Sequence, residues 1–231
     1  MSRNKSEKKG RSVRFAILAM DVVCLSVREN ELVVRLMKTT RSDVHARNSI
    51  PGGLLLPSET AEQGAVRLLR EKGEIKNPRV YFEQLYTMSA LRRDPIGRVV
   101  SVAYLALVPW ERLSSDDRKD TKAASWAKVS SVRRLAYDHD EILSLAVRRL
   151  RAKICYTTLI RTVLPHEFTL TELEERFELI IGRSVDKRNF RRKISVLNIL
   201  KKTSRMRKNM HHRPASLWNF RGRGIQYIKI L

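Results

Sequence analysis

The segment 51–75, PGGLLLPSETAEQGAVRLLREKGEI, has the outline of a phosphate-handling motif. A loop with two glycines is followed by residues of helical periodicity that carry both signs of charge. Gly53, Glu59 and Arg67 follow the spacing G-x5-E-x7-R. In such a loop and helix, carboxylates on one helical face can hold magnesium ions against a pyrophosphate group. The chemistry of this segment therefore depends on which residues share that face.

Leu68, Glu71 and Lys72 stand at positions i, i+3 and i+4, so they lie on one face of the expected helix. That face presents a single carboxylate beside an aliphatic side chain and an ammonium group. Lys72 would repel a divalent cation at the position where the metal should bind. We therefore expect a nucleotide-binding scaffold without metal-dependent hydrolysis, and we predict no catalytic residue, no metal ligand and no cofactor.

A second helical segment presents groups suited to nucleic acid. Phe190, Ile194 and Leu197 recur at i, i+4 and i+7 and form one apolar stripe. Because a helix turns about 100° per residue, the opposite face and its flanks hold Arg188, Asn189, Arg191, Arg192 and Ser195. Arginine can bind guanine and asparagine can bind adenine through paired hydrogen bonds. The helix is therefore suited to bind both the phosphate backbone and the bases.

The charge of the chain also favours a polyanionic partner. Its 47 Lys and Arg against 24 Asp and Glu give a formal net charge of +23 and a pI near 10.7. From Lys187 to the C-terminus there are 14 basic residues and no acidic one. A solvated surface normally mixes both signs, so this excess indicates a nucleic-acid footprint, with a solubilising surface as the alternative.

Composition excludes several other classes of protein. With 42% hydrophobic residues, most of the chain is expected to fold, although residues 1–12 look like a basic disordered tail. Cys24 and Cys155 lie far apart without CxxC spacing, so neither a disulfide framework nor a zinc site is expected. No secretory signal and no run of 18 apolar residues occurs. We expect a soluble cytoplasmic protein associated with the nucleoid and not with a membrane.

The first 137 residues contain strand-like and helical segments. Residues 13–27 are almost wholly apolar, and the polar turn RENE separates them from a second apolar run, which predicts a hairpin of buried strands. Residues 79–88 and 98–110 are strand-like and flank a polar loop at 91–97. With the helix after Gly53, this pattern predicts an α/β domain with a mixed sheet.

From residue 138 to 164, apolar residues recur at helical intervals. Asp138 or Asp140 can cap the start of this segment, and Pro165 ends it. Asp138 and His139 could form a catalytic pair, but a capping carboxylate beside a histidine at a helix start is the favoured interpretation. We expect this long helix to connect two domains.

Two shorter helices and a hairpin are expected at the C-terminal end. Thr169 and Glu172 have the spacing of a capping box, and Gly182 is suited to end that helix. Asp186 is suited to cap the next helix. The basic segment 201–214, KKTSRMRKNMHHRP, fits a wing over phosphates or the minor groove. This order of elements is the plan of a winged helix-turn-helix.

The loop and helix at 51–75 resemble the Nudix box, which continues after the arginine as R-E-U-x-E-E-x-G-U, with U an aliphatic residue. Leu68 and Lys72 replace two of its carboxylates, and Glu74 stands in the place of its glycine. When RRDPIGRVVSVAYLALVP, FTLTELEERFELIIGRSVDKRNFRRKI and RPASLWNF are added, the chain resembles the Nudix-related transcriptional regulators of NAD metabolism, the NrtR-like family. The resemblance covers roughly residues 13–221.

This resemblance implies a fold of two domains joined by a helix. An α/β Nudix-like domain, with a mixed sheet sandwiched by helices, is expected at 13–137, followed by a linker helix at 138–164. An α+β winged helix-turn-helix domain is expected at 165–231. The family further implies a homodimer that binds a palindromic operator in double-stranded DNA and represses genes of NAD synthesis or salvage. ADP-ribose or a related nucleotide would release the DNA, although some relatives sense sugars instead.

The candidate binding residues form two groups. The residues expected to contact DNA are Thr169, Thr171, Lys187, Arg188, Asn189, Arg191, Arg192, Ser195 and Arg213. The residues expected to bind the effector are Arg67, Glu71 and Arg98. For Arg67 the alternative is a structural salt bridge within the loop and helix, and for Arg98 it is a solvated loop residue.

Two further functions are open alternatives. One is an active hydrolase of ADP-ribose-like substrates, in which Glu59, Glu71 and Glu74 recruit a metal in an altered arrangement. The other is an RNA-binding accessory protein. Against it, the basic residues follow a helix-turn-helix pattern and not a sheet with stacking aromatic side chains.

Overall fold

The computed structural model describes residues 15–39, 47–76, 81–95, 97–209, 212–228 and 230, and within 208–213 it describes no side chain. The basic tail predicted at 1–12 therefore lies outside the described residues.

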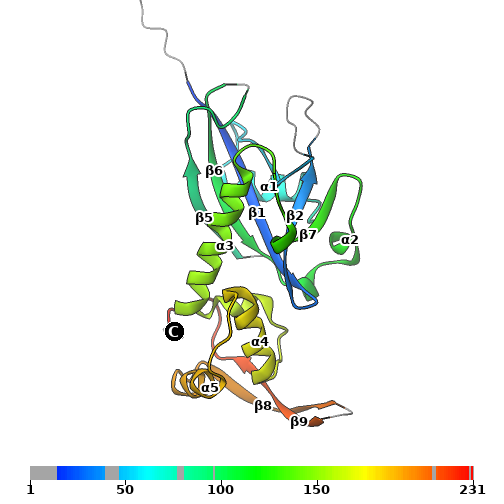
Figure 1. Cartoon of the computed structure of the whole chain (residues 1–231), viewed down its shortest axis with the longest axis vertical. Coiled ribbons are helices and arrows are strands. Elements are labelled where there is room, and N and C mark those ends of the chain that lie inside the picture. Colours follow the sequence, from blue (N-terminus) through cyan, green and yellow to red (C-terminus); the bar gives the residue numbers. More distant parts are fainter. Residues whose placement is uncertain are drawn as a thin grey trace, which may run out of the picture.

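The N-terminal domain is built on a mixed sheet (Figure 1). Its central strands follow the order β3-β2-β1-β6-β5, while β4 pairs with β1 and β7 pairs with β2. The neighbours β1 and β6 are parallel and the other pairs are antiparallel. The strands are β1 (Ile17–Arg28), β2 (Glu31–Lys38), β3 (Asn48–Ser49), β4 (Gly52–Leu54), β5 (Tyr81–Met88), β6 (Val99–Leu107) and β7 (Ala124–Lys128). This arrangement confirms the predicted mixed sheet.

Strands β1 and β2 form the predicted hairpin. Glu29 and Asn30 at its turn have φ of 47° and 60°, the conformation of a two-residue turn whose twist matches that of the strands. Because side chains alternate along a strand, β1 contributes to a core on each face of the sheet. One core contains Met20, Val22 and Cys24, and the other contains Val23, Leu25 and Val27.

Helices cover both faces of this sheet, as predicted. Helix α1 (Ala61–Glu71) starts at a capping box between Thr60 and Gln63 and packs Ala65, Leu68 and Leu69 against one face. Helix α3 (His139–Tyr156) packs against the other. Leu68, which stands where the Nudix box has a carboxylate, is therefore a core residue and is only 1% exposed.

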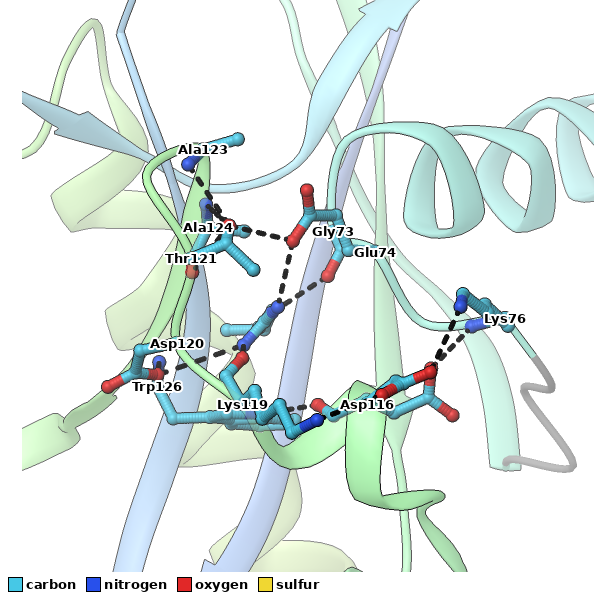
Figure 2. A network of polar contacts seen from close by, with 12 residues as sticks. Gly73, Glu74, Lys76, Asp116, Lys119, Asp120, Thr121, Ala123, Ala124 and Trp126 are labelled. Atoms are coloured by element: carbon cyan, nitrogen blue, oxygen red, sulfur yellow. Dashed lines mark hydrogen bonds and ion pairs between the residues drawn. The ribbon is translucent and has the colours of Figure 1, made fainter.

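The end of the box is held by a fully buried arginine on β2. Arg35 donates to the carbonyl of Gly73 (2.7 Å) and to that of Lys119 (2.9 Å), and it pairs with the Glu74 carboxylate at 3.4 Å. Figure 2 shows Glu74 at the centre of this network, where its carboxylate also accepts a hydrogen bond from Thr121. Glu74 has φ of 54°, so it adopts the left-handed conformation that favours glycine. Glu74 thus keeps the backbone conformation that favours the glycine of the Nudix box, and its side chain adds an ion pair with Arg35.

The connector between the domains is shorter than predicted. The α-helix ends at Tyr156 and not at residue 164, and a 3-10 helix, η3 (Thr158–Val163), follows it. Between them Thr157 is extended and pairs with Tyr227, while Tyr156 and Cys155 accept backbone hydrogen bonds from Ile228 and Ile230. The returning C-terminal segment therefore takes the place of the last helical turns.

The C-terminal domain has the predicted winged helix-turn-helix plan. Helix α4 (Leu170–Ile181) starts at the capping box of Thr169 and Glu172 and ends at Gly182, whose φ is 75°. Helix α5 (Lys187–Val196) is capped by the Asp186 side chain. Strands β8 (Leu200–Asn209) and β9 (His212–Phe220) form the hairpin, which projects from the far end of the molecule (Figure 1). Among the described residues, no helix is both long enough and apolar enough to cross a membrane.

We predict that Arg35 anchors the fold. Replacing it in Arg35→Met would leave the buried Gly73 carbonyl and the partly buried Lys119 carbonyl without their donor and Glu74 without its ion pair, so the free energy of unfolding should fall by about 3 kcal/mol. Arg35→Lys should also destabilise, since one ammonium group cannot reach both carbonyls. Arg133→Met, at an exposed position, is the control and should change stability by less than about 0.5 kcal/mol. Equal urea midpoints for Arg35→Met and Arg133→Met would contradict this role.

Candidate functional site

A cavity of about 280 Å³ opens beside the box, between the sheet and the start of α3. Its wall includes Gly52 and Gly53 from the loop and Lys72 from the end of α1. Charged and aromatic side chains also line it, namely Asp21, Arg93, Tyr137 and His139. The cavity therefore combines glycine backbone with cationic groups, a combination suited to a phosphate-bearing ligand.

A buried ionic network supports this cavity. Arg93 pairs with Asp138 at 2.6 Å and with Asp21 at 3.0 Å, and its side chain is 4% exposed. Asp21 also accepts a hydrogen bond from Ser101 and contacts Nε2 of His139 at 3.4 Å. Burial alone would raise the pKa of the Asp21 carboxyl, but His139, Ser101 and Arg93 together lower it to about 2. The carboxylate is therefore ionised and fully engaged.

The same network fixes the start of α3. The backbone N–H of Ile50 donates to Nδ1 of His139 at 3.1 Å, which ties the first residue of the helix to the loop before β4. Asp138 stands at the N-cap position but makes no capping hydrogen bond, because its carboxylate binds Arg93. Asp140 accepts from the backbone N–H of Leu135. The two aspartates expected to cap the helix therefore bind neighbouring segments instead.

Arg67 binds residues of its own motif. It donates to both oxygens of Glu59 (2.5 and 2.8 Å), to Glu71 at 3.0 Å and to the carbonyl of Leu54 at 3.0 Å. The hydrogen bond from Arg67 lowers the pKa of Glu59 to about 2. This geometry corresponds to the structural salt bridge that was the alternative for Arg67. Arg67 and Glu71 line a separate, shallow hollow and not the cavity beside Lys72.

The residues of the box do not fit a metal cluster. Leu68 is in the core, Glu59 and Glu71 are bound by Arg67, and the Lys72 ammonium donates to the Gly52 carbonyl at 2.6 Å. Within the described ranges, no three His, Cys, Asp or Glu side chains come together in a way that could hold a metal ion. A Nudix enzyme needs carboxylates at these positions, and this arrangement supplies a cation instead.

Helix α5 divides its polar residues into bound and unbound groups. Lys187 and Arg191 each lie 3.2 Å from the carboxylate of Glu174 on α4, which is 1% exposed. Arg192 donates to Asn189 at 3.2 Å. Arg188 and Ser195 are exposed and have no side-chain partner among the described residues. The outer face of α5 thus carries a guanidinium that is available to an external anion.

The other residues expected to contact DNA are placed differently. Thr169 is buried and caps α4, so its hydroxyl is occupied within the protein. The Thr171 hydroxyl accepts from Arg191. Arg205 and Arg207 of the hairpin pair with Glu167 and Glu172 beside α4. Arg213 lies in β9, but its side chain is outside the described part of the structure.

Two family models match this chain and together span both domains. Residues 17–146 match the Nudix domain, and residues 160–220 match the NrtR DNA-binding winged helix domain. The ADPR-responsive transcriptional repressor NtrR of Acinetobacter baylyi is 30% identical over 208 residues, which cover 88% of this chain and 82% of that protein. The chain belongs to the NrtR family.

Solved NrtR structures have the same architecture. NrtR of Shewanella oneidensis complexed with a 27mer DNA matches at a TM-score of 0.75 and 27% identity, covering 88% of this chain and 93% of that one. The Nudix domain of the same NrtR complexed with ADP ribose matches at a TM-score of 0.51 and 25% identity, covering 62% of this chain and 94% of that one. The predicted fold class and family are therefore confirmed.

The predicted effector residues lie outside the cavity of this NrtR-family chain. Arg67 and Glu71 lie on the outer side of α1, and Arg98 donates to the carbonyls of Ser89 and Ala90 in its own loop. Asp21 and Arg93 line the cavity but were not among the residues predicted from the sequence. Asp21 carried a signal, because it is the one charged residue in the apolar run 17–27, and a buried charge needs a partner.

We predict that Asp21 contributes pH-dependent stability. Its pKa falls from an ordinary 3.8 to about 2 on folding, so its contribution is present above pH 3.8 and is lost as pH falls towards 2. Near neutral pH, Asp21→Asn should lower the free energy of unfolding by about 2 kcal/mol. Asp116→Asn, at an exposed ion pair, is the control and should change stability far less, because solvent screens such a pair. Denaturant titrations measure the free energy of unfolding of both proteins as a function of pH. If the difference between wild type and Asp21→Asn stayed constant down to pH 2.5, this assignment would be wrong.

Proposed function

We propose that this chain is a DNA-binding repressor of NAD metabolism genes that releases its operator when ADP-ribose binds in its Nudix domain. The observation that carries the proposal is the placement of α3. Its first residue, His139, lines the cavity, and its last residue, Tyr156, pairs with the segment that returns from the winged helix. A ligand at one end of this helix is thereby linked to the DNA-binding elements at the other (Figure 1).

We further propose that the active form is a homodimer. Two copies of α5 would then occupy successive major grooves of a palindromic operator. Effector binding would favour a different placement of the winged helices, in which the spacing of the two α5 helices no longer fits the DNA. The two domains at 13–137 and 165–231, the cytoplasmic location and DNA contacts by the exposed residues Arg188, Asn189, Arg192 and Ser195 of α5 belong to this proposal. Arg67, Glu71 and Arg98 do not line the cavity beside Lys72 and are not part of it.

The choice of ADP-ribose is supported by the relatives and by the charge of the cavity. The Acinetobacter relative is described as ADPR-responsive, and the Shewanella Nudix domain was solved with ADP ribose. Lys72 and the glycine loop present a cation and backbone groups to the cavity, which suits a diphosphate better than an uncharged sugar. A sugar is therefore the second choice of effector.

We propose that the domain binds ADP-ribose without hydrolysing it. The carboxylates that a metal-dependent Nudix enzyme requires are absent from the inner face of α1 or bound by Arg67. Incubation with ADP-ribose and magnesium, followed by chromatography of the products, tests this point. Formation of AMP and ribose 5-phosphate at an enzymatic rate would favour the hydrolase alternative instead.

The function is tested by a mobility shift with DNA from upstream of this gene and of neighbouring NAD-related genes. We expect sequence-selective binding that ADP-ribose releases. Salt must be held at a physiological concentration, because a chain of formal charge +23 will bind any DNA in dilute buffer. Sequence-selective binding that ADP-ribose does not weaken would exclude ADP-ribose as the effector. Binding without sequence selectivity, or a preference for RNA, would exclude the repressor function.

The exposed face of α5 yields a sharper prediction. Arg188→Ala should weaken operator binding by about 1–3 kcal/mol and leave the melting temperature unchanged, because Arg188 has no partner within the described structure. Arg191→Ala should also lower stability, since it leaves the buried Glu174 carboxylate less well paired. Arg133→Ala, on the sensor domain, is the control. Wild-type affinity of Arg188→Ala for its operator would rule out α5 as the recognition helix.

A further inference from the structure

Lys72 is the lysine that lines the cavity. Its side chain is half-buried, and its ammonium donates one hydrogen bond, to the Gly52 carbonyl at 2.6 Å. An ammonium group has three donors, so two remain for the cavity or its solvent. No carboxylate lies within ion-pairing distance of Lys72 among the described residues. Burial and the charge of Arg67 lower the pKa of Lys72, while Asp21 and Glu71 act more weakly in the opposite direction.

The other cation beside the cavity, Arg93, is already paired with carboxylates of the protein. Arg93 binds Asp21 and Asp138, and Asp21 in turn contacts His139 and Ser101. Arg93 is one cation shared between two carboxylates, so it offers no unpaired positive charge to a ligand in the cavity. Lys72 differs from Arg93 because no carboxylate of the described chain forms an ion pair with it, and Asp21 and Glu71 act on it only from a longer distance.

Gly53 lies against the side chains of Lys72 and Leu68. A Cβ atom on Gly53 would lie 2.9 Å from the Lys72 amine and 2.9 Å from Leu68 Cδ2, which is closer than a real Cβ approaches other atoms. A Cβ at this position would therefore require the Lys72 amine and the Leu68 methyl group, both at the ends of flexible side chains, to move. The two departures from the box therefore act together, since Leu68 fills the core and Lys72 brings a positive charge to the glycine loop.

We propose that Lys72 binds the diphosphate of ADP-ribose directly and replaces the divalent cation with which carboxylate-bearing Nudix boxes hold this group. Effector binding is then independent of magnesium. This inference rests on ADP-ribose being the effector, as proposed above. It assigns to Lys72 the part of the binding energy that comes from the diphosphate, and it makes the sensor respond to nucleotide alone and not to the supply of metal.

The test is calorimetric titration of ADP-ribose into the full-length wild type, Lys72→Met and Lys76→Met at one salt concentration, with EDTA or with magnesium. Lys76 is the matched control because it is exposed, pairs with Asp116 and does not line the cavity. We expect wild-type affinity to change less than twofold between the buffers. Lys72→Met should bind at least tenfold more weakly in both, and Lys76→Met should match the wild type.

Thermal melting distinguishes a structural role of Lys72 from a role in binding ADP-ribose. Removing a half-buried cation without an internal carboxylate partner should leave the melting temperature equal or higher, while the shift caused by ADP-ribose shrinks. Lys72→Glu should bind ADP-ribose weakly in EDTA and regain affinity when magnesium is added.

Three results would overturn the inference or its basis. Wild-type binding that requires magnesium would refute the replacement of the metal, and this result does not depend on whether any variant folds. Undiminished binding by Lys72→Met would refute the contact with the diphosphate. Absence of ADP-ribose binding by the folded wild type in both buffers would instead refute the proposed effector, and the inference with it.

Discussion

Helix α3 packs along one continuous apolar core that starts at the sheet and ends in the winged helix. Ile142 and Leu150 belong to the same core as Val23 and Leu25 of β1, and this core extends through η3 to Phe168 and Phe177. A core packed at the density of an organic crystal transmits displacement, because its side chains have no free volume to absorb it. The position of α3 therefore constrains the cavity at one end and the DNA-binding elements at the other.

The Nudix scaffold has kept its shape while its chemistry has changed. Leu68 adds to the core under α1, and Arg67 binds the two remaining glutamates of the box. Glu74 keeps the left-handed backbone of the glycine position and gains a buried arginine, Arg35, as its partner. Leu68 and Glu74, two departures from the box, thus each have a structural role of their own.

The excess of positive charge on the winged helix serves two purposes. Lys187 and Arg191 bind the buried Glu174, and Arg205 and Arg207 bind Glu167 and Glu172, so these four hold the helices and the hairpin together. Arg188 lies on the solvent side of α5 without an internal partner in the described chain. Net charge predicts the kind of partner, but the internal ion pairs decide which cations are available to it.

The sequence by itself determined the elements, because their signals are local. The apolar runs of the strands, the turn at Glu29 and Asn30, the capping box at Thr169 and the stop at Gly182 depend on neighbours within a few positions. Only the tertiary structure decided the pocket and the length of α3. Asp21 of β1, Arg93 of the loop after β5 and His139 at the start of α3 are far apart in sequence and meet only when these segments pack together. Thr157 leaves the helix because Tyr227 returns to pair with it. Such contacts leave no periodic pattern in the chain, since their energy arises only when distant segments are packed together.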